Sequence, residues 1–89
     1  MDIKNLIDAA KTKSGMPLGA MAAEMQINQV RISEWKKGKY RPNSGNVLYL
    51  AKKAGLNAIE TLAEYEAETN PQFAQLWKEA VSEIRQNQG

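Results

Sequence analysis

A cluster of cations just before Pro42 is the strongest chemical signal in this sequence. Residues 31–41 contain five Lys and Arg side chains and a single acid, Glu34. The formal charge of the whole chain is only +2, because acids outnumber cations after Pro42. A local excess of positive charge of this kind predicts an anionic partner for the segment. The cations are Arg31, Lys36, Lys37, Lys39 and Arg41.

A helix is predicted to carry the first part of this cluster. Asn28 is a suitable N-cap, and the helical pattern ends before Gly38. Ile32 and Trp35 stand three residues apart, which predicts that both belong to the core. At about 100° per residue, the opposite side of the helix is compact, mixed in chemistry and free of bulky aromatic residues. Its members are Gln29, Val30, Ser33, Glu34 and Lys37.

A second short helix is predicted immediately before this one. Pro17 suits a first helical position, and apolar residues follow at helical spacing as far as Met25. Only Gln26 and Ile27 separate this helix from the Asn28 cap. Two helices joined by so short a turn, with cations just beyond, have the spacing at which one helix lies in the major groove of DNA while the other braces it.

The uncharged side chains of the outward face match chemical groups on DNA bases. Gln29 can donate to and accept from one adenine at the same time, with a solvated glutamine in the first turn of the helix as the alternative. Val30 fits a thymine methyl group, with an ordinary surface valine as the alternative. Ser33 is small enough for close approach and fits a base or a phosphate, with a tolerated surface serine as the alternative.

The charged and aromatic residues near this face have other expected roles. Glu34 either accepts a hydrogen bond from a cytosine amino group or, as we favour, pairs with Lys36 or Lys37. Tyr40 either donates to a phosphate or packs against the next helix. Phosphate contacts are expected from the cations Lys36, Lys37, Lys39 and Arg41, with an ordinary solvated surface as the alternative.

The absence of cysteine and histidine removes most catalytic and metal chemistry. Disulfides, Cys/His zinc sites and imidazole or thiol catalysis are excluded. The acids Glu60, Glu64 and Glu68 are interpreted as a solvated helix face, not as a metal site. The apolar runs are far shorter than the roughly 20 residues of a membrane span, and the first residues lack the apolar stretch of a secretory signal. We therefore expect a cytoplasmic protein that is not an enzyme and needs no cofactor.

The remaining periodicity predicts further helices and no strand. One covers residues 3–13 behind the N-cap Asp2, and another follows the basic segment and closes at Gly55. Asn57 opens the next helix. Its inward-facing residues are expected to be Ile59, Leu62 and Ala63.

The last helix carries the most regular apolar stripe in the chain. It follows the cap and first-turn proline of Asn70-Pro71, and only residues 86–89 are expected to be loose. The stripe is covered either by its own domain or, as we expect, by the same stripe of a second chain. The predicted dimer contacts are Phe73, Leu76, Trp77, Val81 and Ile84.

The central part of the chain resembles a known family. The pattern IS-x-W-x-x-G-x-x-x-P covers Ile32 to Pro42, and A-x-x-x-x-I covers Ala22 to Ile27 before it. From about Pro17 to Leu62 the chain is similar to lambda-repressor-like helix-turn-helix regulators, often called the XRE family. The short length and long second half also look like the small repressors of filamentous prophages.

The resemblance implies a fold and a set of contacts. It implies an all-α, five-helix helix-turn-helix domain over residues 1–69, to which residues 70–89 add a C-terminal amphipathic helix. Gln26 departs from the glycine usual at the turn and would need either a left-handed backbone, at some cost, or a slightly different turn. Many members of the family have a phosphate-binding glutamine at the position of Leu18, so that contact has no counterpart here. The residues placed where members of the family touch DNA bases are Asn28, Gln29, Val30, Ser33, Glu34 and Lys37.

These observations predict a sequence-specific DNA-binding transcriptional regulator. A repressor is expected, bound as a homodimer to a pseudo-palindromic operator in double-stranded DNA, because one such unit recognises only a few base pairs. The alternative is a protein-interaction module of antitoxin or antirepressor-like adaptor type. In that case the C-terminal helix would bind a partner protein, and DNA binding would be secondary.

Overall fold

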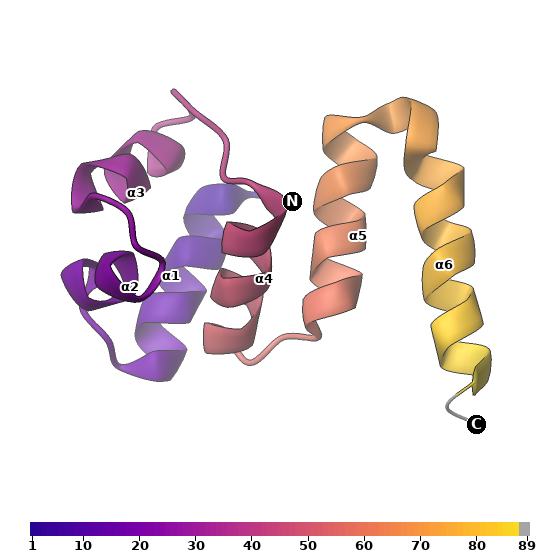
Figure 1. The fold of residues 1–89 in the computed structure, drawn as a ribbon, viewed down its shortest axis with the longest axis horizontal. Helices are drawn as coiled ribbons and strands as arrows, with labels where there is room; N and C mark the ends of the chain where they lie inside the picture. Colours follow the sequence, from indigo (N-terminus) through magenta and orange to yellow (C-terminus); the bar gives the residue numbers. More distant parts are fainter. Residues whose placement is uncertain (88–89) are drawn as a thin grey trace.

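The computed structural model describes residues 1–87, and all regular structure in this range is helical. Helices α1 to α4 gather on one side, and α5 and α6 form an antiparallel hairpin beside them (Figure 1). α5 packs on α4 on one side and on α6 on the other. The all-α prediction with six α-helices is thereby confirmed for the described residues.

The first helix, α1 (Ile3–Ser14), begins and ends as the sequence predicts. The carboxylate of Asp2 accepts a hydrogen bond from the Lys4 amide at 3.0 Å, which satisfies one of the free amides at the helix start. Gly15 follows in the left-handed region at φ 71°, a conformation that glycine adopts without a Cβ clash. α1 supplies Leu6, Ile7 and Ala10 to the core.

A tight turn joins α2 (Leu18–Glu24) to α3 (Gln29–Lys36). Pro17 stands just before α2 rather than within it, one position earlier than predicted. Gln26 has φ 59°, so the left-handed backbone expected at this non-glycine position is confirmed. The Ile27 amide donates to the Ala22 carbonyl at 3.0 Å, and the Asn28 side chain accepts from the Val30 amide at 2.9 Å. These bonds close α2 and open α3.

Asparagine caps also open α4 (Ser44–Lys53) and α5 (Ala58–Thr69). The side chains of Asn43 and Asn57 accept from the amides of Asn46 and Glu60, each at 2.9 Å. The prediction for α5 is only partly right. Leu62 and Ala63 are buried, but Ile59, the second residue of α5, is 42% exposed, beside Ile84 and Arg85 of α6.

The core lies among α1 to α5. Trp35 retains 4% of its exposure and Ile32 none, which confirms their assignment to the core. The buried cluster consists of Leu6, Ile7, Ala10, Met21, Ala22, Ile32, Trp35, Val47, Leu50, Leu62 and Tyr65.

The last helix begins differently from the prediction. A 3-10 turn, η1 (Pro71–Phe73), precedes α6 (Ala74–Asn87), so Pro71 does not open the α-helix itself. Gln86 was expected to be loose but lies in α6, and residues 88–89 lie outside the described part of the chain.

One buried hydrogen bond connects α5 to the loop before α4. The Tyr65 hydroxyl donates to the Pro42 carbonyl at 2.6 Å, and burial raises the pKa of Tyr65. Pro42 directly follows the cations of residues 31–41 and is itself buried, so the bond holds the chain in place where this cationic stretch ends.

Replacing Tyr65 by phenylalanine is therefore expected to lower the free energy of unfolding by about 1–3 kcal/mol, since the Pro42 carbonyl would lose its partner. Urea unfolding followed by circular dichroism measures this change. The matched control is Tyr40→Phe, because Tyr40 is 51% exposed and should tolerate the loss of its hydroxyl. Equal stability of Tyr65→Phe and the parent would contradict the role given to this bond.

Candidate nucleic-acid interface

The outer face of α3 is open, as its sequence predicts. Val30 is 62% exposed, and Gln29, Ser33 and Lys37 are exposed as well. Lys37 is the C-cap residue of α3, so it stands just beyond the helix. The face points toward solvent because Ile32 and Trp35, on the opposite side of α3, are buried in the core.

Asn28 is exposed and its side chain is already partly used. Its carbonyl oxygen accepts from the Val30 amide at 2.9 Å, and this bond caps α3. The amide nitrogen of the side chain is left as the hydrogen-bond donor toward a partner.

The Gln29 side chain lies over Gly19 in α2. A Cβ atom added to Gly19 would come within 3.0 Å of the Gln29 side-chain oxygen. Real Cβ atoms rarely have so close a neighbour, so the absence of a side chain at Gly19 gives Gln29 this position. Nothing in the periodicity of the sequence indicates this contact, because it depends on how α2 and α3 cross.

Glu34 is paired with cations, but not with those predicted. Its Oε1 lies 3.6 Å from Nε of Arg31, and its Oε2 lies 3.8 Å from Nζ of Lys39. Lys36 instead lies 3.2 Å from Asp8 of α1, so the predicted pair with Lys36 or Lys37 is wrong. Arg31 was not expected to take part in this arrangement, although its spacing of three residues from Glu34 was visible in the sequence.

Tyr40 stands at the surface between two cations. The Arg31 guanidinium carbon is 5.8 Å from the centre of its ring, and the Lys39 ammonium is 5.6 Å from it. Its 51% exposure argues against the alternative in which it packs on α4. A cation near an aromatic face is attracted by the ring, so Tyr40 helps to gather positive charge at this edge.

Arg41 turns toward the end of α5. Its Nη1 donates to the Thr69 hydroxyl at 3.3 Å, and its side chain is otherwise exposed. The predicted phosphate-binding cations therefore form two groups. Lys37 and Lys39 lie at the α3 end with most of their surface open, whereas Lys36 and Arg41 already contact other parts of the protein.

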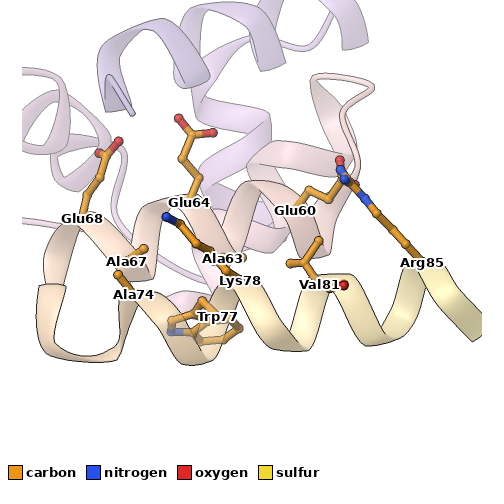
Figure 2. A pocket seen from close by; sticks show the side chains of 11 residues that line it. Glu60, Ala63, Glu64, Ala67, Glu68, Ala74, Trp77, Lys78, Val81 and Arg85 are labelled. Carbon is orange, nitrogen blue, oxygen red and sulfur yellow. The ribbon is translucent and has the colours of Figure 1, made fainter.

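A groove of about 630 Å³ runs between α5 and α6 (Figure 2). Glu60, Glu64 and Glu68 lie along its α5 side, and each has a cationic partner. Arg85 donates to Glu60 from Nε at 2.7 Å, and the amino group of Met1 pairs with Glu64 and Glu68. Within residues 1–87, no group of three or more His, Cys, Asp or Glu side chains is arranged to hold a metal ion.

The apolar residues of α6 lie in two different environments, the groove against α5 and the exposed surface. Trp77 and Val81 line the groove against α5, and Trp77 packs on the core (Figure 2). Phe73, Leu76 and Ile84 are 49%, 59% and 41% exposed. The five predicted dimer contacts therefore do not share one exposed face, because α6 folds back on α5 and takes Trp77 and Val81 into its own hairpin, as the alternative allowed.

Tyr49 of α4 and Glu24 of α2 join these two helices. The Tyr49 hydroxyl donates to Glu24, and Lys53 Nζ lies 3.4 Å from the same carboxylate. Burial and this hydrogen bond raise the pKa of Tyr49 to about 12. The cluster holds α2, and thereby the turn that leads to α3.

No protein-family model, characterised protein or solved structure matches this chain. Among residues 1–87, none of the helices is long and apolar enough to cross a membrane.

The Gly19→Ala variant tests the contact between α2 and Gln29. Alanine should raise the free energy of unfolding by up to about 1 kcal/mol, because it favours helix and the flexible Gln29 side chain can move aside. The side-chain amide resonances of Gln29 should shift, whereas those of Gln75, on α6, should not. A drop in stability would mean that Gln29 cannot leave its place over Gly19.

Proposed function

We propose that this protein is a sequence-specific DNA-binding transcriptional regulator of the lambda-repressor-like helix-turn-helix type, and that it acts as a repressor. One observation carries the proposal: the open outer face of α3, braced by α2 through a tight turn and flanked by cations. Its polar and apolar side chains are suited to base edges, and its cations to phosphates.

Base recognition is assigned to the N-terminal part of α3. Gln29 is suited to adenine and the exposed Val30 to a thymine methyl group. Asn28 contributes its free amide donor, and Ser33 and Lys37 complete the surface at its C-terminal side. Contacts with the DNA backbone are assigned to Lys39 and Tyr40, which are both exposed. Lys36 and Arg41 would exchange Asp8 and Thr69 for phosphates.

A homodimer is proposed because one copy of α3 recognises too few base pairs to select an operator. The three exposed apolar residues of α6 supply a surface for a second copy, with Ile59 close to Ile84 at its edge. Two copies related by a two-fold axis would place their α3 helices roughly 34 Å apart, one turn of DNA.

The Gln29→Ala variant tests base recognition. It should lose roughly 1–3 kcal/mol of binding free energy on the operator and much less on random DNA, because a base contact is lost without any change of charge. Fluorescence anisotropy with duplexes varied at each position measures both. Gln75→Ala, an exposed glutamine of α6, serves as the control. An equal loss on all sequences would show that Gln29 contacts the backbone instead.

The dimer surface is tested by changing Phe73 and Leu76 together to glutamine. The variant should remain helical and become monomeric in sedimentation experiments at micromolar concentration, and its operator affinity should fall by at least about 100-fold, because the two half-sites are no longer bound jointly. Trp77→Gln is the contrasting variant, since it should lower stability by opening the α5–α6 hairpin. A parent protein that is monomeric under the same conditions contradicts this assignment.

The groove between α5 and α6 favours a second candidate function, a protein-interaction module that binds a partner helix. Its floor contains Ala63, Trp77 and Val81, and its rims are charged. Retention on heparin or DNA at about 50 mM salt separates the two candidates. Failure to bind either would favour the interaction module over the DNA-binding regulator.

A further inference from the structure

Glu34 occupies an unusual position for an acid on a surface proposed to meet DNA. It is the one acid of residues 31–41, and its side chain is 23% exposed. The cations on either side are more open, with Arg31 58% and Lys39 65% exposed. Tyr40 lies close to both cations, so the four side chains form one charged cluster, named here the Glu34 cluster.

Both carboxylate oxygens of Glu34 are engaged by these cations. Oε1 faces Arg31 at 3.6 Å and Oε2 faces Lys39 at 3.8 Å. Neither distance is short enough for a hydrogen bond, so the carboxylate keeps lone pairs, but it is 23% exposed and lies between two cations that are more open than it is. The geometry therefore favours a role for Glu34 that acts through Arg31 and Lys39.

Phosphate oxygens and the Glu34 carboxylate are competing partners for the same cations. A DNA phosphate that binds Arg31 or Lys39 competes with the carboxylate for the charge of that cation, and the carboxylate repels the phosphates that approach it. Exposed ion pairs of this kind are individually weak, so the competition reduces phosphate binding without preventing it. The reduction is independent of base sequence, since it acts on the charges alone.

We propose that Glu34 restrains sequence-independent DNA binding by holding Arg31 and Lys39 as an internal competitor for DNA phosphates. This inference rests on the proposed DNA-binding function and adds a means of limiting it. A regulator confronts a vast excess of non-operator DNA, so a lower affinity for phosphates leaves more of the protein free to find its operator.

The Glu34→Gln variant of the full chain tests this restraint. Its affinity for a random-sequence duplex should rise about three- to tenfold near 100 mM salt, because glutamine neither neutralises the cations nor repels phosphates. The plot of log affinity against log salt should become steeper by about 0.9 for each additional phosphate that the released Arg31 or Lys39 neutralises. The duplex alone is the probe, so no operator needs to be known.

Glu79→Gln is the control for net charge. It removes the same charge from an exposed residue of α6. α6 packs on α5 and lies away from α3 (Figure 1). This variant should bind random DNA within about twofold of the parent, and it thereby subtracts the effect of net charge.

A second measurement uses the Lys39→Ala change in both backgrounds. This change should weaken binding to random DNA more in the Glu34→Gln background than in the parent, because Lys39 is then free to bind a phosphate. Equal losses in the two backgrounds would show that Glu34 does not restrain Lys39. Circular dichroism confirms that each variant is folded before binding is compared.

The outcomes distinguish this inference from the proposed function. A parent that binds no DNA at about 50 mM salt overturns the proposed function and the restraint together. A parent that binds DNA, with a Glu34→Gln variant of unchanged affinity and salt slope, overturns the restraint alone. Weaker binding by Glu34→Gln, or loss of discrimination at one base pair of a selected operator, would give Glu34 a direct contact and also overturn it.

Discussion

The burial of Ile32 and Trp35 is the constraint on which the candidate interface depends. Ile32 is fully buried and Trp35 retains 4% exposure, so rotating α3 about its axis would expose two large apolar side chains at a cost of about 1.5–3 kcal/mol for each. The side opposite these anchors is consequently held toward solvent. The packing of Ile32 and Trp35 in the core therefore holds Gln29 and Val30 toward solvent.

The turn between α2 and α3 adds a second constraint. Gln26 adopts a left-handed backbone at φ 59°, which costs a residue with a Cβ about 1–2 kcal/mol. Hydrogen bonds on both sides of the turn and the buried side chains of Met21 and Ile32 offset this cost. α2 thus has a fixed relation to α3, and its Gly19 leaves room for the Gln29 side chain.

Most of the fold could be predicted from the sequence because local signals determine it. Asparagine caps and apolar spacing correctly indicated α3 and α5, and Gly55 marked the end of α4. The errors concern contacts between distant elements. Lys36 pairs with Asp8 of α1 and Trp77 turns toward α5, and helical periodicity alone does not encode which neighbour a side chain meets. The outward face of α3 was predictable, whereas the arrangement of charges around it was not.

The central claim is that α3 recognises a DNA sequence in a two-fold symmetric assembly. Selection of bound duplexes from a random pool by the unmodified protein tests it most directly. A dimer that recognises DNA through α3 should enrich a pseudo-palindrome whose half-sites are centred about 10 base pairs apart, which is one helical turn, or a multiple of that spacing. A selected pool with no enriched sequence, from a protein shown to be folded and at a salt concentration where it binds DNA, would contradict it.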